Sequence, residues 1–155
     1  MEDNTGSYKE ALEYLYGLQK FGIKFGLSKT SNILSCFNNP HLGRRYIHIA
    51  GTNGKGSVAS FLCSMLGRAG FRVGMYTSPH LVRFTERFRV NENAIDRSQV
   101  VRLVRDVKEA VAPEEPPTFF EFTTAMALLY FAREQTDIDI MEVGMGGRLD
   151  ATNII

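Results

Sequence analysis

The stretch at residues 51–57, which reads GTNGKGS, constrains the fold of this 155-residue chain more than any other. It separates an apolar, partly β-branched run at residues 46–50 from a helical apolar pattern that begins at Lys55. Glycine in ordered backbone costs roughly 0.5–1 kcal/mol relative to alanine, so the cluster must solve a problem that side chains cannot. Backbone N–H groups that no Cβ shields, at the positive end of a helix, can bind phosphates. We therefore expect a nucleotide phosphate site here.

Each residue type in this loop suits that role. Gly51, Gly54 and Gly56 let the backbone approach a phosphate chain, Lys55 supplies a mobile positive charge, and the Ser57 hydroxyl can serve a phosphate or a metal. The usual pattern is G-x-x-x-x-G-K-[ST]. Here an isoleucine stands in place of its first glycine, and an extra glycine separates the lysine from the serine. A glycine-rich structural turn is the alternative interpretation.

The periodicity of apolar residues predicts an α/β chain. Strands are expected at 46–50, 72–78 and 137–144, and 79–95 reads as a long loop or loose hairpin. The first strand, the glycine loop and a helix are followed by another strand, two helices and a third strand, which is typical of right-handed crossovers and a parallel sheet. Helices are expected at 8–19, 29–37, 55–69, 96–111 and 119–134. In the third of these, the helically spaced apolar residues are Val58, Phe61, Leu62, Met65 and Leu66.

Polar groups follow each of the three predicted strands. In sheets of this kind, ligands bind beyond the carboxyl ends of the strands. The glycine loop follows Ala50, the sequence TSPH begins just after Tyr76, and Glu142 follows Met141. We therefore expect these groups to meet at one edge of the sheet.

Composition excludes several classes of protein. Hydrophobic residues make up 44% and charged residues 23%, with a net charge of +1, which gives no case for nucleic acid or an anionic membrane as partner. No apolar run approaches the roughly 20 residues that cross a bilayer, and the polar, acidic N-terminus is unlike a signal peptide. The two cysteines do not suggest a disulfide framework, and Cys63 is expected to be a buried thiol. We expect a cytoplasmic location.

Four stretches in order carry a family resemblance: GTNGKGS, then YTSPHLVRFTERFRVN (76–91), TFFEFTTAMAL (118–128) and EVGMGGRLDATNII (142–155). Together they resemble the Mur ligase superfamily, and specifically its folylpolyglutamate synthase/dihydrofolate synthase branch. The cell-wall ligases of that superfamily typically read GTNGKT instead. The resemblance implies an α/β, three-layer P-loop fold with a mainly parallel sheet flanked by helices. Residues 1–155 would be the N-terminal portion of its ATP-binding domain, without the rest of that domain or the C-terminal glutamate-binding domain.

The resemblance also implies an activity and its participants. It predicts an ATP- and Mg²⁺-dependent amide ligase that adds L-glutamate to dihydropteroate, folate or both through an acyl phosphate. Lys55 would be catalytic, and Ser78 and Glu142 would bind Mg²⁺. The alternatives are a turn residue at Ser78 and an ordinary strand-end carboxylate or salt bridge at Glu142. The implied ATP-binding residues are Gly51, Thr52, Asn53, Gly54, Lys55, Gly56 and Ser57.

Two further segments would contact the pterin of the substrate. Thr118 and Glu121 are also spaced as a helix capping box, and the two phenylalanines between them suit a core equally well. Residues 80–91 resemble a mobile loop over the folate site, in which Phe84 and Phe88 would stack on a flat ring. Its arginines, Arg83, Arg87 and Arg89, would either form a solvated face or balance glutamate carboxylates. The implied pterin-contacting residues are Thr118, Phe119, Phe120, Glu121, Leu149, Asp150 and Ala151.

Two other functions remain open on the sequence. One is a cell-wall amino-acid ligase with a UDP-sugar substrate, and the other is a catalytically inactive nucleotide-binding fragment. Members of the family run to more than twice this length, so we expect the isolated chain to lack ligase turnover. A sheet with only three parallel strands would also expose an edge and favour poor stability or self-association. The full-length protein is expected to be a monomer.

Overall fold

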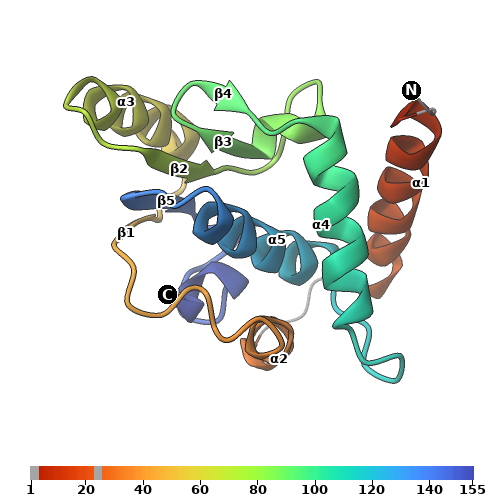
Figure 1. Cartoon of the computed structure of the whole chain (residues 1–155). Helices are drawn as coiled ribbons and strands as arrows, with labels where there is room; N and C mark the ends of the chain where they lie inside the picture. The colour runs from red at the N-terminus through yellow and green to blue at the C-terminus, as the bar shows by residue number, and fades with distance from the viewer. Residues whose placement is uncertain (1–3, 23–25) are drawn as a thin grey trace.

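The computed structural model describes residues 4–22 and 26–155. Its centre is a five-stranded sheet with the order β1-β5-β2-β3-β4 (Figure 1). The first three of these, β1 (Tyr46–Ile49), β5 (Ile138–Glu142) and β2 (Val73–Tyr76), run parallel. The other two, β3 (Phe88–Val90) and β4 (Asn93–Ala94), are antiparallel additions. The predicted α/β class with a mainly parallel sheet is confirmed.

The hairpin formed by β3 and β4 enlarges the sheet beyond the three strands expected. The segment 79–95 contains the short helix η2 (Phe84–Arg87) and then β3, whose Phe88 pairs with Tyr76 of β2. Phe88 and Val90 are buried on one face of the sheet, whereas Arg89 between them is only partly buried. A strand of three residues is too short for this alternation to stand out in the sequence.

The helix α3 (Lys55–Arg68) covers one face of the sheet, and its predicted position is confirmed. The expectation for its apolar face is wrong in part. Val58, Phe61 and Met65 are 47%, 69% and 67% exposed. The small side chains of Ala59 and Cys63 pack on the sheet instead, which lets the helix axis lie close to the strands. The buried thiol expected at Cys63 is confirmed.

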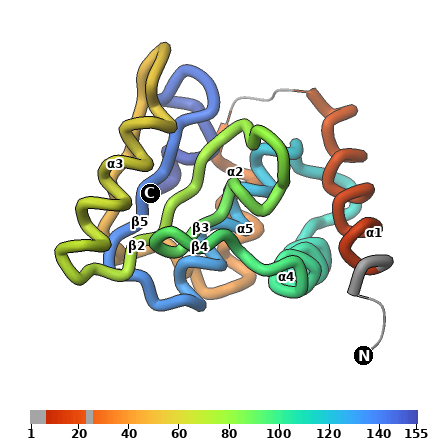
Figure 2. The backbone as a smooth tube through the Cα atoms, turned by 90° about the horizontal axis from the view of Figure 1, so that it is seen from above, coloured from red at the N-terminus to blue at the C-terminus, as the bar shows by residue number. Residues whose placement is uncertain are grey.

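The opposite face is covered by a helical layer built around α5 (Phe119–Arg133). Residues 121–131 of α5 are all buried, because α1 (Asn4–Gly17), α2 (Ser28–Ser35) and α4 (Arg97–Glu109) surround the helix away from the sheet. The views agree that α3 and α1 lie at opposite ends of the molecule (Figures 1 and 2). All five predicted helices are present, and helical layers on both faces match the expected three layers.

Two short helical turns complete the chain. The first, η1 (Leu18–Phe21), continues from α1, and the second, η3 (Ala151–Ile154), follows the turn after β5. Within residues 4–22 and 26–155, no helix combines the length and apolar character that crossing a bilayer requires.

A buried ion pair fixes the start of β5. The Arg44 Nε donates a 2.9 Å hydrogen bond to Asp139, whose side chain is fully buried. Gly74 on the neighbouring strand leaves the room for it, because a Cβ there would lie 2.5 Å from the Asp139 Oδ1. This packing sets the register that carries the ends of β2 and β5 to the same edge of the sheet.

Candidate active site

The carboxyl ends of the three parallel strands form one crevice, as the sequence predicts. The Ser78 N–H donates a 2.8 Å hydrogen bond to the Glu142 Oε2. A Cβ added to Gly56 would lie 3.8 Å from the Glu142 Oε1, so the first turn of α3 passes directly beside this carboxylate. Gly56, Ser57, Ser78 and Glu142 line the same cavity. The predicted juxtaposition is confirmed, while the roles of these residues remain predictions.

The glycine loop has the backbone conformation that its composition demands. Gly54, the N-cap of α3, has φ +77° and ψ 3°, in the left-handed region that strains other residues. Residues 51–54 are exposed, so their backbone is accessible to a ligand. The Lys55 Nζ donates a 2.9 Å hydrogen bond to the Gly51 carbonyl, which holds the ammonium group over the loop. An accessible loop backbone with an ammonium group beside it suits phosphate binding.

Glu142 is a buried carboxylate without a cationic partner. Its side chain is 5% exposed, and it forms no ion pair within residues 4–22 and 26–155. Burying a charge without a partner is costly, so the residue is suited to a bound cation. One carboxylate and the Ser78 hydroxyl are hard oxygen donors, and Mg²⁺ takes few such protein ligands while keeping waters and phosphate oxygens. These residues therefore fit a Mg²⁺ ion.

No cluster of three or more His, Cys, Asp or Glu side chains with metal-site geometry occurs in the described part of the chain. Ser78 and Glu142 are the described residues that would hold the ion.

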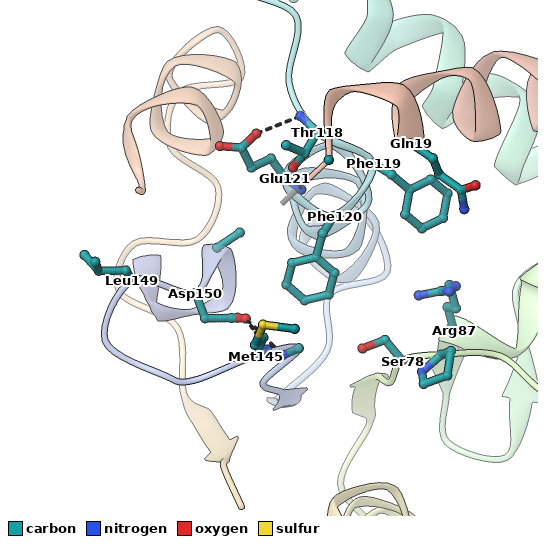
Figure 3. Close-up of a pocket in the computed structure, with 14 residues that line it drawn as sticks. Gln19, Ser78, Arg87, Thr118, Phe119, Phe120, Glu121, Met145, Leu149 and Asp150 are labelled. Carbon is teal, nitrogen blue, oxygen red and sulfur yellow. Dashed lines mark hydrogen bonds between the residues drawn. The ribbon is translucent and has the colours of Figure 1, made fainter. Parts of the chain in front are cut away.

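A second cavity, of about 290 Å³, lies at the N-terminus of α5 (Figure 3). It is bounded on one side by α5 and on the other by the turn that follows β5. Ser78 and Pro79 form a wall that it shares with the crevice. The structure brings together in this aromatic pocket all seven residues predicted to contact the pterin: Thr118, Phe119, Phe120, Glu121, Leu149, Asp150 and Ala151.

The capping interpretation of Thr118 and Glu121 is also correct. The Glu121 N–H donates to the Thr118 Oγ1 at 3.2 Å, and the Thr118 N–H donates to the Glu121 Oε2 at 2.7 Å. Capping presents the next two residues, Phe119 and Phe120, to the pocket with both rings half-buried. The Phe119 ring stacks on Tyr16 at 5.9 Å between centroids. The helix start therefore serves the fold and the pocket together.

Asp150 shapes the opposite wall through its own hydrogen bonds. The Oδ2 atom accepts from the N–H groups of Gly144 and Met145 at 3.0 and 2.9 Å (Figure 3). The Oδ1 atom accepts from the Thr152 N–H. A Cβ on Gly144 would lie 2.5 Å from the Cζ atom of Phe120. The bare glycine therefore sets the position of that ring.

Arg87 lines this pocket and is not part of the solvated face that the sequence offered as one interpretation of the loop arginines. It is 7% exposed, its guanidinium carbon lies 5.1 Å from the Phe119 ring centroid, and its Nε donates a 2.8 Å hydrogen bond to the His80 Nδ1. The expectation that Phe84 and Phe88 stack on a ligand is wrong. Both are core residues, 2% and 0% exposed. Gln19, far away in sequence, also lines the pocket, and no local motif marks it.

No family model matches the chain. A probable bifunctional folylpolyglutamate synthase/dihydropteroate synthase of Haloferax volcanii is 43% identical over 152 residues, which cover 96% of this chain and 18% of that protein. A dihydrofolate synthase/folylpolyglutamate synthase of Bacillus subtilis is 41% identical over 155 residues, which cover 96% of this chain and 36% of that protein. The crystal structure of a Thermotoga maritima folylpolyglutamate synthase superposes with a TM-score of 0.90 at 46% identity. The match covers 99% of this chain and 37% of that one.

Over 96% or more of its length, the chain is similar to folylpolyglutamate synthases and dihydrofolate synthases. It spans only 18% to 36% of the length of these two relatives. Other folylpolyglutamate synthases of the same fold have been solved with nucleotides. The Mycobacterium tuberculosis enzyme, complexed with ADP and AMPPCP, matches at 34% identity and a TM-score of 0.89, covering 99% of this chain and 35% of its own. A folylpolyglutamate synthase complex with AMPPCP and folate matches at 35% identity and a TM-score of 0.86. The match covers 96% of this chain and 38% of that one.

Proposed function

We propose that this segment is the N-terminal portion of the ATP-binding domain of a Mg²⁺-dependent amide ligase. The ligase joins the amine of L-glutamate to the carboxyl group of dihydropteroate, of a folate, or of both. Two relatives at 41–43% identity are named as folylpolyglutamate synthases with a second, dihydropteroate or dihydrofolate synthase activity. A similar structure holds AMPPCP and folate. One observation of the structure carries the proposal. The Ser78–Pro79 wall belongs both to the crevice beside the glycine loop and to the aromatic pocket.

The reaction proceeds in two steps, phosphoryl transfer to the acceptor and then amide formation. A carboxylate oxygen of the acceptor attacks the γ-phosphorus of ATP, and the bond between that phosphorus and the bridging oxygen breaks to release ADP. The amine nitrogen of glutamate then attacks the acyl carbon of the resulting acyl phosphate. Inorganic phosphate leaves, and the nitrogen loses a proton to solvent. Both steps require that the reacting groups be held within about 3–3.5 Å.

The crevice supplies what the first step needs. The exposed amides of the loop and the ammonium group of Lys55 bind the phosphates, in an orientation set by the left-handed Gly54. Ser78 and Glu142 would hold the Mg²⁺ ion, and the ion would supply charge neutralisation for the transferred phosphoryl group. Glu142 is already fixed by the Ser78 N–H, so little ordering is needed when the ion binds.

The aromatic pocket supplies the binding site of the acceptor. Phe119 and Phe120 offer apolar surface to a flat pterin, while the buried Arg87 and the exposed Gln19 offer hydrogen-bond donors at its edge. A pterin held there directs its benzoate past Ser78 and Pro79 toward the phosphates. The pocket thus orients the carboxylate for attack.

The proposal is tested with a protein of full family length that carries this segment. ADP release and amide product are measured with ATP, Mg²⁺ and L-glutamate, using dihydropteroate or tetrahydrofolate as acceptor. We expect turnover that depends on one of these acceptors and on Mg²⁺. Turnover with a UDP-sugar acceptor instead would point to a cell-wall ligase. Nucleotide binding without an acyl phosphate that hydroxylamine can trap would identify a protein without ligase activity. Either of these two results contradicts the proposal.

A further inference from the structure

The cavity beside the glycine loop is larger than a metal and a phosphate group require. Its volume is about 510 Å³, and it extends from the first turns of α3 to the segment between β2 and β3. Gly56, Ser57 and Glu142 form the end near the loop, where nucleotide and metal are proposed. The rest of its lining includes Ser60 of α3 and Arg89 of β3, together with the polar residues His80 and Glu86.

Strand geometry directs Arg89 into this cavity. Side chains alternate between the faces of a strand, and its neighbours Phe88 and Val90 belong to the core beneath α5. Arg89 pairs with Met75 of β2, which packs against α3 on the other face. Its guanidinium group therefore lies on the α3 side of the sheet, in the same cavity wall as Met75.

The guanidinium group of Arg89 has no partner there. Its Nε is buried without a hydrogen bond, and Arg89 forms no ion pair within residues 4–22 and 26–155. Buried charged donors are costly to leave unsatisfied. An anionic ligand in the cavity would remove that cost.

The two carboxylates in the same wall do not meet this need. Glu86 accepts hydrogen bonds from the backbone N–H groups of Leu81, Val82 and Arg83, at 2.7 to 3.3 Å. Glu142 accepts from the Ser78 N–H. Both acids are thus engaged by backbone amides, while the arginine that faces the same cavity is not.

We propose that this cavity contains a carboxylate subsite in which Arg89 binds a glutamyl carboxylate. The inference rests on the proposed ligase function and adds a subsite to it. The amine of glutamate must reach an acyl carbon near Ser78, so a cation in the wall of the same cavity is well placed to hold a carboxylate of that amino acid. A guanidinium group matches a carboxylate with two parallel hydrogen bonds. The carboxylate comes either from the incoming glutamate or from the glutamyl tail of a folate acceptor.

The test compares Arg89→Gln and Arg89→Lys with the parent protein at full family length. Arg102→Gln, which removes an exposed arginine on α4, is the matched control. In Arg89→Gln, loss of a charge-assisted hydrogen bond predicts a rise of about 10- to 100-fold in the KM for the substrate whose carboxylate Arg89 binds. We expect kcat at saturating substrate to stay close to that of the parent. The lysine variant keeps the charge without the two-pronged geometry, so we expect it to recover part of the affinity.

Two acceptors distinguish the sources of the carboxylate. With dihydropteroate, which has no glutamyl tail, a raised KM for L-glutamate assigns Arg89 to the incoming amino acid. A raised KM for tetrahydrofolate, with no change for dihydropteroate, assigns Arg89 to the tail. Either result supports the subsite. Unchanged values for both ligands, or a rise confined to ATP or dihydropteroate, would overturn it.

Direct binding separates this inference from the proposed function. Calorimetry with L-glutamate and with a pteroylpolyglutamate measures affinity without turnover, so the subsite is tested even if the parent protein is not a ligase. Weaker binding of either ligand to Arg89→Gln than to Arg102→Gln supports it, and equal binding excludes it. Thermal unfolding of each variant checks that the fold is retained.

Discussion

The backbone N–H of Ser78 donates a 2.8 Å hydrogen bond to the side chain of Glu142, joining the ends of two adjacent parallel strands. Tyr76 of β2, two residues before Ser78, pairs with Met141 of β5, the residue before Glu142. The carboxylate also lies beside the first turn of α3, because a Cβ on Gly56 would be 3.8 and 4.0 Å from its two oxygens. Sheet register thus fixes an anionic group in the crevice next to the glycine loop.

Glu142→Gln tests the proposed metal role. The amide oxygen can still accept from the Ser78 N–H, so we expect the fold to survive while the negative charge is lost. Metal stabilisation of phosphoryl transfer is worth several kcal/mol, so kcat should fall by about 100-fold or more. The Mg²⁺ concentration for half-maximal rate should rise as well. Steady-state kinetics across a Mg²⁺ titration measure both, and an unchanged Mg²⁺ dependence would exclude Glu142 as a ligand.

Lys55→Ala should abolish ATP turnover while leaving pterin binding largely intact. Its ammonium group lies over the glycine loop, whereas the aromatic pocket is lined by other residues. Calorimetry with AMPPCP and with dihydropteroate compares the two affinities directly. Lys9→Ala, which removes an exposed lysine on α1, is the matched control. An equal loss of affinity for AMPPCP and for dihydropteroate would indicate a folding defect instead of a phosphate-binding role.

Gly144→Ala should damage the aromatic pocket selectively. The new methyl group would lie 2.5 Å from the Cζ atom of Phe120, so that ring must move. Overpacking of this kind costs about 1–3 kcal/mol, and we expect dihydropteroate affinity to fall by about 10-fold or more. Gly17→Ala is the control, because no heavy atom lies within 4 Å of its added Cβ. Urea unfolding and calorimetry measure the two effects, and unaltered pterin binding would show that the Phe120 position is unimportant.

The sequence predicted the crevice because its signals are local. A glycine loop between a strand and a helix, and polar residues directly after two further strands, are short-range patterns that a parallel sheet brings together. The Thr118 and Glu121 capping box is equally local, and it fixed the start of α5 correctly. The residues expected at the aromatic pocket came from the family resemblance, and they lie together there because they occupy two short segments.

The errors arose where tertiary packing overrides a local pattern. Phe61 and Met65 have helical spacing, yet α3 meets the sheet through Ala59 and Cys63. Spacing cannot indicate which of two adjacent helix faces is in contact. The sequence places Arg89 among the arginines of the predicted folate loop, but the side of the sheet to which its side chain points depends on the register of a three-residue strand. Gln19 reaches the pocket only because α1 and η1 fold back toward α5.

His80 should make pterin binding depend on pH. Its Nδ1 accepts the Arg87 Nε–H at 2.8 Å, which requires the neutral ring, and burial together with the Arg87 charge lowers the pKa of His80, with Glu86 opposing them. A lowered pKa means that the unfolded chain binds a proton before the folded chain does. Stability from this contact is therefore lost as pH falls from about 6.5 through the pKa of the folded state.

Once His80 is protonated, Arg87 loses its acceptor and faces a like charge at the edge of the pocket. We expect dihydropteroate affinity to weaken below about pH 6.5 in the parent protein. His80→Gln keeps an acceptor but does not titrate, so its affinity should vary less over the same range. Calorimetry from about pH 5.5 to 8 compares the two proteins. Protonation of the ligand affects both equally, so the same pH dependence in both would rule out His80 as its source.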